Sequence, residues 1–111
     1  MAEQNNKVET EEFKPNDAQN IVTKVRIFPF KEGTNLGHFR GLASIEVYGA
    51  LVIRGLRIME GADEGKYFVG YPIDSFYKGE DFRTIVTPIN DNVKQAIEHA
   101  VLSKYHEYLN S

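Results

Sequence analysis

Basic side chains recur in the strand-like segments of this 111-residue sequence, and phosphate binding is the chemistry that they could supply. The period-two alternation of a strand gathers them on the polar faces of neighbouring strands. They are Lys24, Arg26, Arg40, Arg54 and Arg57. A second interpretation is equally open, namely a solvated sheet face on which these cations pair with Glu46 and Glu60.

Catalytic and metal-binding chemistry finds little support in the sequence. His99, Ser103 and His106 share one side of a predicted helix, but the two histidines lie too far apart along it to chelate one ion. The chain has no cysteine, and therefore no thiolate nucleophile and no cysteine-ligated metal. Phosphate-binding glycine loops, nucleophile elbows and HExxH motifs are also missing. We predict a non-enzymatic protein without catalytic residues, cofactor or metal.

The aromatic residues have two possible uses. Seven phenylalanines and six tyrosines could include platforms on which nucleic-acid bases stack. Four of the phenylalanines, however, lie within apolar strand patterns, and this favours packing in the core. They are Phe28, Phe39, Phe68 and Phe82.

Strands must position most of these residues. Alternating apolar residues and turn signals predict five strands and a hairpin turn around Gly49. The expected strands lie within 21–30, 39–48, 50–59, 66–72 and 82–86. In the third of them, Ile53 and Leu56 are an odd number of residues apart, so both can be buried only if one extra residue is inserted. We predict a β-bulge at or near Gly55, which would turn Arg54 and Arg57 to one outward face.

An amphipathic helix follows the strands. Its apolar residues recur at spacings of three and four and form one stripe. They are Ile89, Val93, Ala96, Ile97, Ala100, Val101, Tyr105 and Tyr108. Asn90 is the predicted N-cap, Asp91 suits the positive end of the helix dipole, and Pro88 fixes the entry into the first turn.

Composition divides the chain into a tail and one domain. Residues 1–20 hold two basic and five acidic side chains and few apolar ones, so we expect a disordered acidic tail. Residues 21–111 hold the other 11 basic and 11 acidic side chains, so this α+β domain is neutral. Neutrality neither indicates nor excludes a basic patch, because a patch depends on arrangement. No apolar run approaches the roughly 20 residues of a membrane span. With no signal-peptide pattern either, we expect a cytoplasmic protein without membrane insertion.

Four short segments occur in an order that is specific to one family. They are "RGLASIEV", "LRIMEG", "FRTIVTPIN" and "AVLSKYHEY". Through them the chain, from about residue 21 to residue 108, resembles the stage V sporulation protein G family, the bacterial septation regulators. The resemblance implies a small antiparallel β-sheet with a C-terminal helix, in a homodimer that shares strands across its two-fold axis. It also implies a non-enzymatic role in division septum formation, in sporulation where the host forms spores, and in site-selective DNA or RNA binding.

The chain departs from the family pattern in one loop. Where the family commonly has Met-Pro-Ser followed by basic residues, this chain reads "YPIDSFYKGED", with Ile73 and Asp74 in place of the serine and a basic residue. Lys78 is the one positive charge left before Arg83, and Thr87 stands where the family usually has histidine. If the basic loop holds phosphates in relatives, this chain should bind nucleic acid more weakly or at another place.

We therefore predict a cytoplasmic, dimeric regulator that contacts DNA or RNA. Arginines and lysines would bind phosphates, and the side-chain amides of helix residues would form hydrogen bonds with base edges. The candidate residues are Arg40, Arg54, Arg57, Arg83, Lys94, Lys104, Asn92 and Gln95. The alternative is a protein-interaction module of the cell-division machinery that does not bind nucleic acid, with the sheet edge or the helix as its contact surface.

Overall fold

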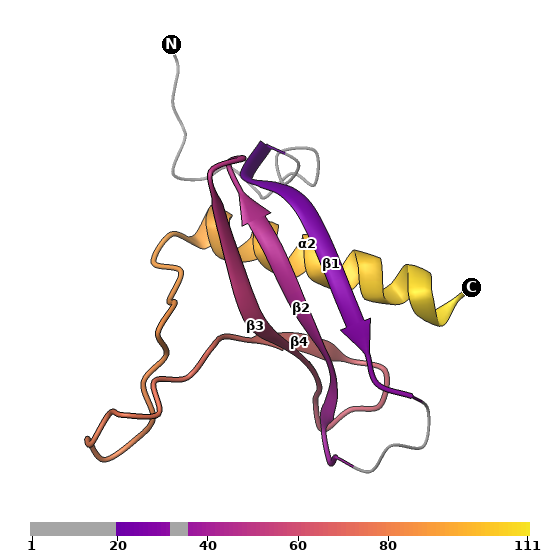
Figure 1. The fold of residues 1–111 in the computed structure, drawn as a ribbon. Helices are drawn as coiled ribbons and strands as arrows, with labels where there is room; N and C mark the ends of the chain where they lie inside the picture. Colours follow the sequence, from indigo (N-terminus) through magenta and orange to yellow (C-terminus); the bar gives the residue numbers. More distant parts are fainter. Residues whose placement is uncertain (1–19, 32–35) are drawn as a thin grey trace.

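The structure, a computed structural model, describes residues 20–31 and 36–111 and places one helix on one face of a four-stranded antiparallel sheet (Figure 1). The strands follow one another in the order β1-β2-β3-β4. The elements are β1 (Val22–Pro29), β2 (Phe39–Val47), β3 (Leu51–Glu60), β4 (Tyr67–Gly70) and α2 (Asp91–Leu109). This arrangement confirms the predicted α+β class and the C-terminal helix. Residues 1–19 of the predicted tail lie outside the described residues.

The core lies between α2 and the sheet. On β2, Ala43, Ile45 and Val47 are buried, and the residues between them are more exposed, as expected for a strand covered on one face. Leu56 and Ile58 of β3 join them. The helix contributes Ala96, Ile97, Val101 and Tyr105. Within the described ranges, no element covers the opposite face, which we call the open face.

The turn between β2 and β3 forms as predicted. Tyr48 and Gly49 both have positive φ, at 56° and 64°. The Ala50 N–H donates to the Val47 carbonyl at 2.9 Å. Two consecutive residues with positive φ are typical of a type I′ turn, whose twist matches that of the strands it joins.

The predicted N-cap is confirmed, but the predicted apolar stripe begins too early. Asn90 has extended backbone angles, and its side-chain oxygen accepts the Val93 N–H at 3.1 Å. Ile89, which precedes the cap, is 97% exposed and does not join the core. The apolar residues that pack against the sheet start at Val93, inside the helix.

The bulge predicted near Gly55 is confirmed. Ala43 pairs with Leu56, whereas Ile45 pairs with Ile53, so β3 has one more residue than β2 over this interval. Gly55 takes φ of 82°, a value that favours glycine. Because of the extra residue, Ile53 and Leu56 both face α2.

The predicted fifth strand does not form a regular strand. Residues 72–85 instead make a narrow two-stranded arm that projects from the sheet (Figure 1). One bridge joins Ile73 to Thr84, and the Ile85 N–H donates to the Pro72 carbonyl at 2.7 Å. Proline has no N–H to extend a ladder, so the arm has only sparse pairing.

Three of the four phenylalanines predicted to lie in the core are exposed. Phe28 is 52% exposed, Phe68 48% and Phe82 69%. Phe82 lies on the arm, whereas Phe28 and Phe68 lie on the open face, in phase with outward-facing neighbours. Phe39 is half-buried, with its ring edge against Phe30 at a centroid distance of 4.9 Å. The prediction failed because an apolar alternation does not show whether a second layer covers the sheet.

We predict that the positive φ angle at residue 55 is the reason why this residue is glycine. Replacement by alanine should lower the free energy of unfolding by about 1–2 kcal/mol, the cost of placing a side chain in the left-handed region. Space is not the reason, because a Cβ atom at Gly55 would meet Pro72 at an ordinary 3.6 Å. Gly55→Asn should cost less, since asparagine tolerates this region. Urea unfolding measures both, with Gly61→Ala as the control at a glycine without positive φ. Equal losses at residues 55 and 61 would contradict the prediction.

Candidate nucleic-acid interface

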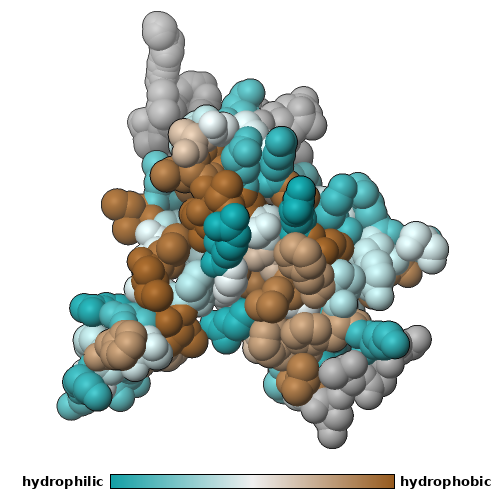
Figure 2. Space-filling view, viewed as in Figure 1, coloured by the Kyte–Doolittle hydropathy of each residue, from teal (hydrophilic) through white to brown (hydrophobic). Residues whose placement is uncertain are grey.

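A groove of about 500 Å³ crosses the open face over β1, β2 and β3. Figure 2 looks onto this face and shows hydrophobic areas interrupted by hydrophilic side chains. The groove is lined by Lys24, Arg26, Phe28, Leu42, Ala43, Ser44, Ile45, Glu46, Val52, Arg54 and Gly55. Its lining therefore combines cations with apolar and aromatic surface.

Strand register explains why the groove lies where it does. Arg26 on β1 pairs with Ser44 on β2, and Arg54 lies on β3 opposite the same stretch of β2. Ser44 has a short side chain and Gly55 has none, so the sheet is hollowed between two long arginines. Two residues further along the same face, Phe28 of β1 pairs with Leu42 of β2.

The groove carries excess positive charge. Lys24, Arg26 and Arg54 line it, against one carboxylate, that of Glu46. Within residues 20–31 and 36–111, none of the three cations lies within 4 Å of a carboxylate oxygen. Glu46 instead accepts a hydrogen bond from the Thr23 hydroxyl at 2.8 Å. The pairing with Glu46 that the sequence left open is thus not formed, and no carboxylate of the described residues neutralises the three cations.

Arg57 borders the groove and is held in place. It pairs with Leu42 on β2 and Gly70 on β4, so it faces outward, as predicted with Arg54. Its guanidinium donates to the Tyr71 carbonyl at 3.3 Å. A Cβ atom at Gly70 would come within 2.9 Å of the same guanidinium, which therefore lies over the glycine.

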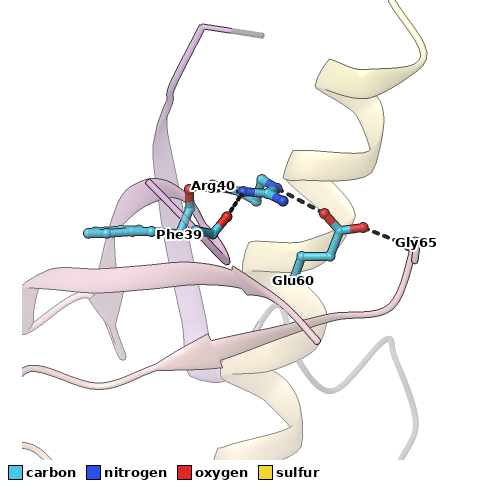
Figure 3. Close-up of polar contacts among 5 residues, drawn as sticks. Phe39, Arg40, Glu60 and Gly65 are labelled. Carbon is cyan, nitrogen blue, oxygen red and sulfur yellow. Dashed lines mark hydrogen bonds and ion pairs between the residues drawn. The ribbon is translucent and has the colours of Figure 1, made fainter. Parts of the chain in front are cut away.

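Arg40 does not share the face of the other strand cations, and here the prediction was wrong. Phe39 pairs with Met59 and Gly41 with Ile58, so β2 has an extra residue at Arg40. The Arg40 Nε donates to a Glu60 carboxylate oxygen at 2.8 Å (Figure 3). The pairing of Glu60 with a strand cation, the second interpretation from the sequence, holds at this one place.

Arg40 and Glu60 lie on the helix side, next to an aromatic cluster. The Tyr67 ring meets Tyr105 of α2 edge to face at a centroid distance of 5.1 Å. Burial raises the pKa of Tyr105, and the positive charge of nearby Arg40 opposes that increase. The Gly65 N–H donates to the second oxygen of Glu60 at 2.8 Å. This bond, and then the one from Arg40, lowers the pKa of Glu60 below its ordinary value of 4.5.

Arg83 is engaged within the arm. Its guanidinium binds the Asp74 carboxylate at 2.9 Å and lies 4.5 Å from the centroid of the Tyr77 ring. The hydrogen bond from Arg83 lowers the pKa of Asp74. Asp74, which replaces a basic residue of the family pattern, thus neutralises the arginine that follows it in the arm.

The four helix candidates lie on α2, across the sheet from the groove. Lys94 and Lys104 are exposed, but ten residues of helix separate them by about 15 Å along the axis. Asn92 is exposed and Gln95 is half-buried. The candidates therefore fall at four places, namely the groove and its border, the arm, the helix, and the ion pair of Arg40 with Glu60, and one chain does not bring them together.

The sequence prediction missed Phe28 and Ser44 as parts of the candidate site. A signal for Phe28 was available, because it lies in phase with Lys24 and Arg26 on the same strand. Ser44 had no such signal, since its importance is the space that it leaves between two arginines of other strands.

Other kinds of site are not found in the part of the chain that the structure describes. Over residues 20–31 and 36–111, no three histidine, aspartate or glutamate side chains are grouped so as to hold a metal ion. Within the same residues, no helix has the length and apolar character needed to cross a bilayer.

Comparison with known proteins places residues 21–107 in a match to the SpoVG family. A relative from Phytoplasma australiense is 37% identical over 90 residues, which cover 81% of this chain and 88% of the relative. One from Priestia megaterium is 36% identical over 85 residues, covering 77% of this chain and 82% of the relative. One from Clostridioides difficile (strain 630) is 32% identical over 88 residues, covering 79% and 89%. Each relative is named "Putative septation protein SpoVG".

We predict that Glu60 makes stability depend on pH. Its lowered pKa means that the ionised carboxylate stabilises the folded state above pH 4.5, the ordinary value, and that this stabilisation is lost as the pH falls through the folded-state pKa. Glu60→Gln should therefore be less stable than the wild type near neutral pH, and the difference should shrink in acid. Urea unfolding at a series of pH values measures this. Glu64→Gln, at an exposed carboxylate, is the matched control. A difference between Glu60→Gln and the wild type that stays constant with pH would contradict the assignment.

Proposed function

Because the chain belongs to the SpoVG family, we propose that it is a non-enzymatic regulator of division septum formation, and of sporulation where its host forms spores. The names of its relatives support the septation role. We propose further that it works in the cytoplasm by contacting DNA or RNA with the open face of its sheet.

The observation that carries the nucleic-acid part is the unneutralised charge in the groove. Lys24, Arg26 and Arg54 line it without an ion pair to any residue of the described ranges. Cations in this state can neutralise phosphates and release the counterions condensed on a nucleic acid, which is the main source of sequence-independent affinity. The arm is a weaker candidate because its arginine is already paired with Asp74.

A homodimer is the second element of the proposal. Phe76, Phe82 and Ile85 of the arm are 84%, 69% and 67% exposed. Exposed apolar side chains of this size are typical of surfaces that a partner covers. The arm also leaves backbone groups without a neighbouring strand, which a second copy related by a two-fold axis could pair. The dimer would duplicate the groove.

The same apolar arm favours the alternative function. A protein of the division machinery could cover Phe76 and Phe82 in place of a second copy, and the chain would then be an interaction module that does not bind nucleic acid. Binding measurements on nucleic acid separate the two functions.

We predict a salt-dependent affinity for short DNA and RNA that depends on the groove. Replacing both Arg26 and Arg54 with glutamine should weaken binding to all sequences. It should also lower the slope of log affinity against log salt by about 1.4–1.8, which is about 0.7–0.9 for each phosphate that the variant no longer neutralises. Fluorescence anisotropy at several salt concentrations measures both quantities.

The matched control is the pair Lys94→Gln and Lys104→Gln, which removes the same charge from α2. This control should leave the slope unchanged. If the salt slope falls for the helix pair and not for the groove pair, the nucleic-acid binding site would have to be assigned to α2 instead. No binding by the wild-type protein would favour the protein-interaction alternative.

We predict that the wild-type protein is a dimer at low micromolar concentration. Phe82→Asp combined with Ile89→Asp should convert it to a monomer, because charges would replace two exposed apolar side chains at and next to the arm. Sedimentation velocity measures the mass. Val52→Asp, at an exposed apolar residue of the open face, is the control and should remain dimeric. A wild-type protein that sediments as a monomer would rule out the homodimer.

A further inference from the structure

We propose that the groove on the open face binds a single-stranded segment of nucleic acid, with an unpaired base stacked on the ring of Phe28. This inference rests on the proposed nucleic-acid function and specifies its ligand and its contact. It draws on three features of the groove: an exposed ring, cations on both sides of a hollow, and a strand backbone that is packed closely against its neighbour at the ring.

The ring of Phe28 is exposed beside the cations. Phe28 is 52% exposed and follows Lys24 and Arg26 on the outward side of β1, each two residues from the next. Residues at this spacing on a strand lie about 6.8 Å apart. A base stacked on the ring would therefore bring its flanking phosphates within reach of the cations of the same strand. Stacking on aromatic rings with phosphates on nearby cations is how proteins commonly hold single strands.

The backbone at Phe28 is closely packed against β2. Gly41 lies opposite Pro29, and a Cβ atom at Gly41 would come within 2.9 Å of the Pro29 Cα and 3.0 Å of the Phe28 carbonyl oxygen. β1 can approach β2 this closely only because residue 41 is glycine. The ring of Phe28 therefore projects from a backbone that is already ordered, so a ligand would not have to order the strand.

The hollow favours a single strand over a duplex. Its floor is Ser44, and Arg26 and Arg54 rise on either side. A base inside a duplex is stacked and paired, so it cannot reach a ring on the surface of a sheet, whereas an unpaired base can. A duplex could touch the cations with its phosphates, but it would leave Phe28 unused.

An acidic peptide is the competing ligand. It would satisfy Lys24, Arg26 and Arg54 through its carboxylates but has no need of an exposed ring. The position of Phe28 in the groove therefore favours nucleic acid. This difference in the use of the ring is what the experiment measures.

The experiment compares ring and non-ring variants at residue 28. Full-length protein is titrated with labelled oligo-U and oligo-dT of about 10 nucleotides, a typical site size, and with a hairpin duplex. Phe28→Leu keeps an apolar side chain but removes the ring, and Phe28→Tyr keeps the ring. Tyr108→Leu is the control at a similarly exposed aromatic residue, 44% exposed, on the helix.

We expect the single strands to bind more tightly than the hairpin. Phe28→Leu should weaken single-strand binding about 5- to 140-fold, the range that stacking of one base accounts for. It should leave hairpin binding and the melting temperature nearly unchanged. Phe28→Tyr and Tyr108→Leu should bind like the wild type.

Three other results would each overturn the proposal. Equal binding of hairpin and single strand, with no effect of Phe28→Leu, would overturn the preference for a single strand and the stacking on Phe28, but leave the nucleic-acid function in place. No binding of any oligonucleotide would overturn both. The third result is a protein that binds poly-glutamate but no oligonucleotide. If Arg26→Gln weakens that binding and Phe28→Leu does not, the groove would be assigned to an acidic protein partner.

Discussion

The register of each strand determines which side chains face α2 and which face solvent, and three register shifts change that assignment in this sheet. At Gly55 the shift lets Ile53 and Leu56 both face the core and leaves Arg54 outside. At Thr23 a shift lets Val22 be buried while Lys24 faces out, and the Thr23 hydroxyl bonds Glu46 and the Gly49 N–H. These shifts place the cations on the open face and the apolar residues against α2, and the groove depends on that separation.

The same constraint removes one cation from the groove. The shift at Arg40 turns its guanidinium to the helix side, where Glu60 neutralises it and the Gly65 N–H holds the carboxylate. One sheet thus uses its arginines in two ways. Arg40 joins the end of β3 to β2 beside the helix, whereas Arg54 lies over the hollow without an ion pair to the described residues. Because the two positions differ in register rather than in residue type, composition alone does not separate an arginine that forms an ion pair in the fold from one that lines the groove.

Sequence reasoning succeeded where a local pattern carries the information. The shift at Gly55 was predictable because apolar residues on both sides of it fall out of phase. The cap at Asn90 was predictable from residue type and position. The shift at Arg40 was not predictable. Phe39 would fit the apolar pattern on either side of such a shift, and Gly41 has no side chain that would indicate which face of the sheet it lies on. Proline at residue 72 limits the pairing of the predicted fifth strand. The exposure of Phe28 and Phe68 depends on which face α2 covers, and this is tertiary information. For the same reason, the eight candidate residues were of suitable chemistry but were divided among the groove, the arm, the helix and an ion pair.

The central claim is that nucleic acid meets the open face of the sheet rather than α2. Backbone amide chemical shifts, followed by NMR while a short oligo-U is added to isotope-labelled protein, test it most directly. The account predicts that the perturbed amides cluster on β1, β2 and β3 around Arg26, Ser44 and Arg54, with the exposed side of α2 unchanged. Perturbations that cluster on α2 or on the arm, with the groove amides unchanged, would contradict it.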